Sequence, residues 1–248
     1  RKPTRRPLAE GVVEHEREAV LARDADLVDD PGLAVRAAAA AAQAGVPLAV
    51  SSLERLVAEG TDPPVPWPSS VREDFVRQLG AGSDTVPVWE DLEASGLVVR
   101  WLPDWERIRH RPQRTPVHRH TVDRHSIEAV AEAAALARTV ERPDLLLMAA
   151  LLHDIGKGWP GDHSATGAVI AQTLADRVGF DEDDVETISE LVRHHLLLPT
   201  VATSRDLEDP ATVTMVADLV GTTERLDILA ALTEADARAA GPAACPGS

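Results

Sequence analysis

The sequence has 248 residues, which is enough for one or two domains with a sizeable core. It carries 41 acidic against 25 basic residues, a formal charge of −16, and a chain this acidic is a poor general binder of nucleic acid or anionic membranes. With no Tyr and only two Phe, it offers few rings on which single strands could stack. We therefore expect neither a nucleic-acid partner nor membrane association.

The cysteine content and the hydropathy of the sequence indicate the cellular compartment in which the protein is expected. The single cysteine, Cys245, excludes a disulfide within the chain, which fits a reducing cytoplasm. The sequence has no apolar run long enough to span a membrane and no secretory signal pattern. We expect a cytoplasmic protein.

The first part of the chain predicts short elements around a helical region. Residues 11–14 and 19–22 are typical of two short strands in a hairpin. Helices are expected over residues 33–44, 53–58, 69–79 and 88–94, bounded by glycine, proline and serine. The apolar residues 97–105 predict an extended segment packed against the following domain. We therefore expect residues 26–115 to form a small, mainly helical linker domain without a catalytic set, and the Gly/Pro-rich residues 241–248 to form a flexible tail.

A basic cluster ends this linker, with arginines at 107, 109, 111 and 114. Two interpretations stay open. The cluster is either a solvated linker or a positive rim that steers a phosphorylated or acidic partner toward a site.

Eight nearly unbroken apolar residues, 145–152, precede His153 and Asp154. A run that is apolar on all sides predicts a helix buried at the centre of a fold. His153 and Asp154 then place two potential metal ligands at the edge of a core, where charge is costly unless it is paired or bound to a metal. Alternatively, they are the polar end of a helix that faces water and is capped by Gly156.

Other polar residues extend the apolar stripes of neighbouring predicted helices. His125 continues the stripe of the helix over 121–139, His195 that of 184–197, and Asp236 that of 224–238. One inward histidine is more often a core residue, but several together predict a shared metal. Imidazole and carboxylate together suit Mn, Fe, Zn or Mg.

Three further basic residues lie near the candidate metal ligands in the sequence, and each has two possible interpretations. Lys157 follows His153 by four residues and either binds phosphate and stabilises transition-state charge or is solvated past a helix end. Arg205 either contacts a substrate phosphate or pairs within its loop. His194 is about 100° around the helix from His195, so it is either a ligand or a bystander.

The order of His125, the His153-Asp154 pair and a distant Asp236 resembles the HD superfamily of metal-dependent phosphohydrolases. The surrounding stretches resemble the HD domain of the bacterial PII uridylyltransferase/uridylyl-removing enzymes. The resemblance is strong over residues 116–240 and weaker before them. It rests on residues 121–125, 153–158, 161–164, 192–197, 204–210 and 232–236.

The resemblance implies an all-α fold, with an HD helical bundle over residues 116–240. It also implies that residues 1–25 are the tail of a nucleotidyltransferase-type domain. The Gly-Ser pair and two aspartates of a transferase site do not precede them, and the glutamine-sensing ACT domains do not follow. We expect a fragment without transferase activity and without a response to glutamine.

The resemblance also implies a reaction, in which water attacks phosphorus and releases UMP or AMP from a tyrosine of the PII signal protein. His125, His153, Asp154 and Asp236 would hold a divalent metal, foremost Mn²⁺ or Mg²⁺, with Fe or Zn as alternatives. His163 and His195, and with less support His194, would bind a second ion or the nucleotide phosphate, and Asp154 would bridge two ions. Two alternatives remain. One is an HD hydrolase of a free nucleotide (a dNTP, an alarmone or a cyclic nucleotide), and the other is a non-enzymatic regulatory module.

Overall fold

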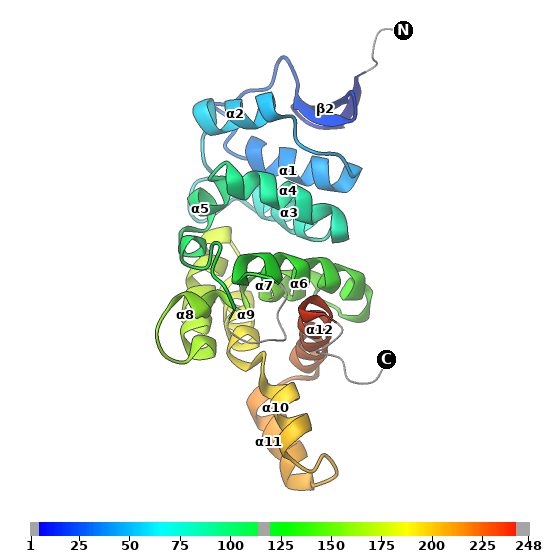
Figure 1. The fold of residues 1–248 in the computed structure, drawn as a ribbon, viewed down its shortest axis with the longest axis vertical. Coiled ribbons are helices and arrows are strands. Elements are labelled where there is room, and N and C mark those ends of the chain that lie inside the picture. The colour runs from blue at the N-terminus through cyan, green and yellow to red at the C-terminus, as the bar shows by residue number, and fades with distance from the viewer. Residues whose placement is uncertain (1–4, 114–119, 242–248) are drawn as a thin grey trace. The chain divides into compact units, whose positions relative to one another are not determined.

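The computed structural model describes residues 5–113 and 120–241 (Figure 1). The described chain divides into two compact units. The first runs to Glu106 and includes Arg177–Gly179, whereas the second comprises Arg107–Asp176 and the residues from Phe180 onward. The compact units divide between Glu106 and Arg107, and the expected domain boundary at residues 115–116, which lies outside the described residues, stays a prediction. Within the described residues, no helix combines the length and apolar character that crossing a bilayer requires.

The first unit begins with a three-stranded antiparallel sheet in the order β1-β2-β3. Its strands are β1 (Arg6–Ala9), β2 (Val12–His15) and β3 (Glu18–Leu21). The expected hairpin is β2 and β3, in which Val12 pairs with Leu21 and His15 with Glu18. Strand β1 was not expected, since its four residues include an arginine and a proline and lack an alternating apolar pattern.

Five helices of the first unit follow: α1 (Leu33–Ala44), α2 (Val50–Glu59), α3 (Ser69–Leu79), α4 (Thr85–Ala94) and α5 (Leu97–Trp101). Buried alanines along α1 allow α3 to approach closely. The extended segment predicted over residues 97–105 is wrong. These residues form α5 and a 3₁₀ turn, Pro103–Arg107, because their apolar side chains recur at helical spacing. Trp101 and Trp105 pack edge-on against Trp67 and Trp89 of the same unit.

The second unit is a helical bundle around α7 (Pro143–Leu152), whose side chains from Leu145 to Leu152 are all buried. Helices α6 (Val122–Leu136), α9 (Glu182–His194) and α12 (Thr223–Ala240) pack against α7. The remaining helices are α8 (His163–Val178), α10 (Leu197–Ser204) and α11 (Pro210–Val220). The fold is therefore all-α apart from the small sheet.

Arg142 fixes how α7 enters the bundle. Its guanidinium bonds to both carboxylate oxygens of Asp184 on α9, at 2.8 and 2.6 Å, and also to Asp144 in the first turn of α7. Planar guanidinium suits such two-pronged pairing. The far end of α7, where His153 follows, is thereby held in a fixed position relative to α9.

Candidate metal centre

A pocket of about 480 Å³ opens where α6, α9 and α12 meet the end of α7. Two carboxylates, two imidazoles and one ammonium line it, so it is rich in groups that bind metals and phosphate. His125 and His153 are buried beside these carboxylates. The lining residues are Arg111, Pro112, Gln113, Val122, Asp154, Lys157, His163, His195, Leu196 and Asp236.

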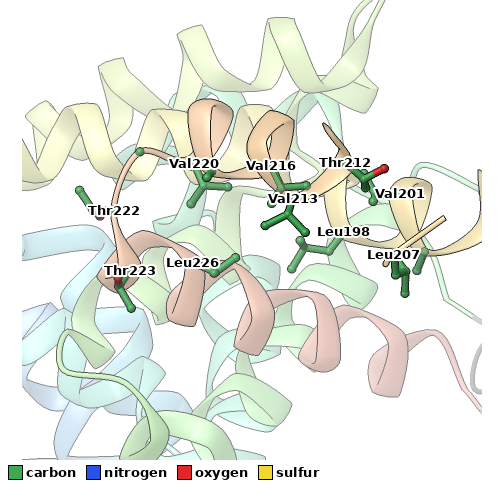
Figure 2. A pocket seen from close by; sticks show the side chains of 13 residues that line it. Leu198, Val201, Leu207, Thr212, Val213, Val216, Val220, Thr222, Thr223 and Leu226 are labelled. Carbon is green, nitrogen blue, oxygen red and sulfur yellow. The ribbon is translucent and has the colours of Figure 1, made fainter. Parts of the chain in front are cut away.

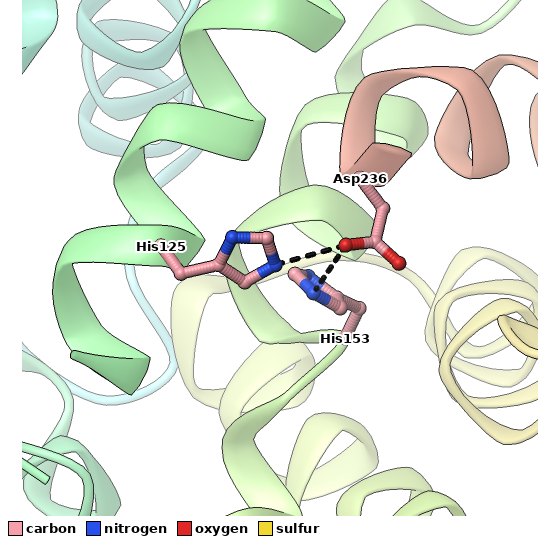
Figure 3. Close-up of side chains that lie close together, drawn as sticks. All are labelled: His125, His153 and Asp236. Atoms are coloured by element: carbon pink, nitrogen blue, oxygen red, sulfur yellow. Dashed lines mark hydrogen bonds and ion pairs between the residues drawn. The ribbon is translucent and has the colours of Figure 1, made fainter. Parts of the chain in front are cut away.

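Three separate segments bring the first group of side chains together (Figure 3). Nε2 of His125, on α6, lies 2.8 Å from Oδ1 of Asp236 on α12. Nε2 of His153, just past α7, lies 3.7 Å from the same oxygen and 3.4 Å from Oδ2 of Asp154. Oδ2 of Asp154 is also 3.9 Å from Nε2 of His125. All four predicted primary ligands therefore converge.

The other oxygen of Asp154 faces a second group. Its Oδ1 lies 3.8 Å from Nε2 of His195 and 4.0 Å from Nε2 of His163. In each group the potential ligand atoms lie within 4.8 Å of one another. The two oxygens of Asp154 thus face different groups of potential ligands.

Backbone hydrogen bonds set the tautomers of two histidines. Nδ1 of His153 lies 2.8 Å from the carbonyl of Ala150, and Nδ1 of His195 lies 2.7 Å from that of Val192. A carbonyl only accepts, so each Nδ1 carries the proton and each Nε2 presents a lone pair when the ring is neutral. Nε2 of His153 is buried and has no hydrogen-bond partner among the described residues. A nitrogen oriented in this way is typical of a metal ligand.

The electrostatics of the pocket favour ionised carboxylates. Burial raises the pKa of Asp154, but the charges of His153 and Lys157 outweigh it and hold the pKa well below the ordinary value. Burial likewise opposes ionisation of Asp236, yet the hydrogen bond from His125 and the charge of His153 lower its pKa to about 2. A buried carboxylate, Asp154, and a half-buried one, Asp236, beside imidazole nitrogens fit a divalent cation.

In the absence of a metal, the pKa values of His153 and His195 shift in opposite directions. Burial lowers the pKa of His153, but the carboxylate of Asp154 outweighs it and raises that pKa to about 9. Burial and the neighbouring charge of His153 lower the pKa of His195 to about 4. His195 is thus already neutral near pH 7, whereas His153 holds a proton that a cation would displace.

The comparison with known families matches residues 122–232 to the family described as HD domain. Those residues run from the start of α6 into α12 and include His125, His153, Asp154 and His195. Residues 122–232 are an HD domain.

The HD domain and the unit before it have close relatives. The chain is 62% identical over 240 residues to the bifunctional uridylyltransferase/uridylyl-removing enzyme of Streptomyces coelicolor, covering 97% of this chain and 29% of the relative. It is 51% identical over 243 residues to that of Mycobacterium tuberculosis, covering 98% and 30%. The enzyme of Gluconobacter oxydans is 42% identical over 173 residues, covering 63% and 18%. The chain thus spans less than a third of the length of these curated relatives.

Lys157 lies in a 3₁₀ turn, Ile155–Gly158, directly after His153 and Asp154. Its Nζ is 2.6 Å from Oδ2 of Asp154 and 2.9 Å from Oε1 of Gln113. Gln113 was missed by the sequence analysis, because it lies in a Pro/Arg-rich loop with no periodic pattern around it. Its contact with Lys157, a half-buried residue that also bonds Asp154, is visible only in three dimensions.

Close packing at Gly156 determines the position of His163 relative to Asp154. A Cβ on Gly156 would lie 2.0 Å from the carbonyl oxygen of His163 and 2.6 Å from the nitrogen of Gly167. The turn after Asp154 therefore passes directly over the first turn of α8. Asp162 caps that helix by accepting hydrogen bonds from the backbone of Ser164 and Ala165 at 2.9 and 3.3 Å. His163 is held beside Asp154 as a result.

Two other candidates, His194 and Arg205, do not line this pocket. Nε2 of His194 lies 3.2 Å from Oε2 of Glu190, one helical turn back. Arg205 ends α10 and is exposed. Of the arginine cluster, Arg111 lines the pocket, Arg107 lies over the ring of Trp159, and Arg114 falls outside the described residues. Both interpretations of the cluster remain predictions.

The HD domain has a second, apolar pocket of about 510 Å³ between α10, α11 and the start of α12 (Figure 2). Its lining consists of leucine, valine, alanine, threonine and glycine residues and includes no ionisable side chain. Such a lining supplies neither metal ligands nor acid–base groups, which gather instead in the pocket around Asp154.

Proposed function

We propose that the HD domain is a metal-dependent hydrolase that removes a nucleotidyl group from a tyrosine of the PII signal protein. The observation that carries this proposal is the convergence of His125, His153, Asp154 and Asp236 at an open pocket. The names of the relatives include uridylyl removal, which favours UMP over AMP as the product. The proposed setting is the cytoplasm.

The donor set supports a divalent cation, Mn²⁺ or Mg²⁺ foremost, held by His125, His153, Asp154 and Asp236. His163 and His195 would hold a second ion on the other side of Asp154, or a phosphate oxygen. When bound, such a cation supplies Lewis acidity and lowers the pKa of water near the phosphorus. Nitrogen ligands together with carboxylates suit Mn²⁺ better than Mg²⁺, which prefers oxygen alone.

The chain's own residues bind and orient the phosphoryl group. Lys157 has three N–H donors, of which two go to Asp154 and Gln113. The third is available to a phosphoryl oxygen, where a fixed positive charge stabilises the charge that develops as water attacks. Tyrosine phenolate is a fairly good leaving group, so the reaction does not require a dedicated general acid.

The test is hydrolysis of nucleotidylated PII by the purified chain with Mn²⁺. Released nucleoside monophosphate is followed by chromatography, and loss of the group from PII is followed by intact mass. A dNTP, an alarmone and a cyclic nucleotide are assayed in parallel. Release from modified PII, abolished in Asp154→Ala, is the expected result. Release from free nucleotides alone would refute the PII proposal and favour a free-nucleotide hydrolase, and no release from any substrate would refute the enzyme itself.

A further inference from the structure

Gln113 is a polar residue of the pocket that the proposed chemistry does not yet use. It lies in the loop that leads into α6, 44 residues before Lys157, and the two side chains meet with Oε1 of Gln113 at 2.9 Å from Nζ of Lys157. Both residues line the same pocket. The loop therefore reaches back over the turn that carries Lys157.

The charge of Lys157 fixes the orientation of the Gln113 amide. An ammonium group only donates, so the atom that faces Nζ must be the carbonyl oxygen of the glutamine. Nε2 of Gln113 is then the amide atom that makes no bond to Lys157. That nitrogen is buried and has no hydrogen-bond partner within residues 5–113 and 120–241. Buried donors are normally satisfied, and an exception at a functional pocket points to a ligand that completes the bonding.

We propose that Gln113 contacts the substrate, with its Nε2 donating to the non-bridging phosphoryl oxygen that Lys157 also approaches. This inference rests on the proposed function of the site. The amide N–H and the third N–H of Lys157 are adjacent donors, because Oε1 of the same amide accepts from Nζ. Two adjacent donors, one of them charged, match an anionic phosphoryl oxygen better than a neutral base carbonyl. Gln113 also orients Lys157 through its carbonyl oxygen.

Replacing the amide with a carboxylate separates the two roles. Gln113→Glu keeps an acceptor for Lys157 but removes the N–H donor and sets a negative charge toward the phosphoryl oxygen. We expect hydrolysis of bis(4-nitrophenyl) phosphate with Mn²⁺ to fall on the order of 10²-fold in Gln113→Glu. Gln172→Glu, the same exchange at an exposed position of α8, is the matched control and should keep wild-type rates. Activity of Gln113→Glu within about threefold of wild type would overturn substrate contact, since orientation of Lys157 alone tolerates a carboxylate.

A second comparison uses the Lys157→Ala background. If Gln113 donates to the substrate directly, Gln113→Ala lowers the rate roughly tenfold further in that background. If Gln113 acts only through Lys157, the added substitution changes nothing, and the inference fails. Circular dichroism and Mn²⁺ content, measured on every variant, identify losses that come from misfolding or an emptied metal site.

The phosphodiester probe also separates this inference from the proposed function. If the wild-type chain hydrolyses the probe and neither Gln113 substitution lowers the rate, the inference about Gln113 is refuted and the proposed function is not. A wild-type chain that hydrolyses neither the probe nor nucleotidylated PII refutes the proposed function, and the role of Gln113 with it.

Discussion

Nε2 of His125 lies 2.8 Å from Oδ1 of Asp236, although the two residues are 111 positions apart in the chain. This contact joins α6 to α12, the pair of helices that flank α7. Adjacent ligands of one octahedral ion, each at about 2.1 Å, lie about 3 Å apart, so the observed separation is one that a shared cation can occupy with little movement.

Asp236→Asn removes one carboxylate charge from the proposed primary ligands while keeping the side chain's size. We expect Mn²⁺ content to fall and phosphodiester hydrolysis to drop at least about 10²-fold, because a neutral amide is a much weaker ligand for a divalent cation. Elemental analysis and initial rates measure the two effects. Asp227→Asn, an exposed aspartate on the same helix, is the control. A fully active, metal-loaded Asp236→Asn protein would contradict the ligand assignment.

Divalent metal should stabilise the second unit. A ligand that binds only the folded state at 100 times its dissociation constant adds about 2.7 kcal/mol. For a domain of this size that is a rise in melting temperature on the order of 5–10 °C. Differential scanning calorimetry with and without Mn²⁺ after chelation measures it. The transition of the first unit should not move, and equal shifts in both transitions would argue for a nonspecific salt effect.

Binding of Mn²⁺ should strengthen as the pH rises from about 6.5 toward 9. In the metal-free protein the pKa of His153 is raised from 6.5 to about 9, so its proton stabilises the fold below pH 6.5, and that contribution is lost as pH rises through 9. The cation must displace this proton, which predicts an apparent affinity that rises by roughly tenfold per pH unit. Anaerobic Mn²⁺ titrations between pH 6.5 and 8.5 measure it. A flat affinity over this range would mean that His153 is not a ligand.

Gly156→Ala should disrupt the site through the backbone. The added Cβ meets main-chain atoms of His163 and Gly167, which cannot move aside as a flexible side chain can. We expect destabilisation of about 3 kcal/mol and loss of most hydrolysis as His163 shifts. Chemical denaturation and initial rates measure both. In Gly161→Ala the Cβ meets no atom within 4 Å, so only the strain of its positive φ, roughly 1–2 kcal/mol, is expected. Equal effects of the two substitutions would contradict the close-contact argument.

Helical periodicity was enough to predict most of the architecture. The expected helices at residues 33–44 and 69–79 coincide with α1 and α3, where glycine and proline mark both ends. The same periodicity placed His125 and Asp236 on inward faces, since each continues an apolar stripe. The apolar segment 97–105 was misassigned because apolar content was weighed there without its spacing.

Features that depend on distant contacts were beyond the sequence. The protonated nitrogens of His153 and His195 are determined by carbonyls three residues back, which only the local geometry reveals. His194 and His195 are neighbours in sequence, yet one pairs with Glu190 and the other faces Asp154. Gln113 had no local pattern at all, and its role follows from a contact across 44 residues.

The span between His125 and Asp236 also has a consequence for biosynthesis. A nascent chain exposes three of the four proposed primary ligands well before α12 has left the ribosome. Until Asp236 emerges and α12 packs against α6, the proposed site lacks its second carboxylate. His125, His153 and Asp154 alone would hold a cation only weakly. Loading of an ion would thus be a late event in the maturation of this domain, after α12 has been synthesised.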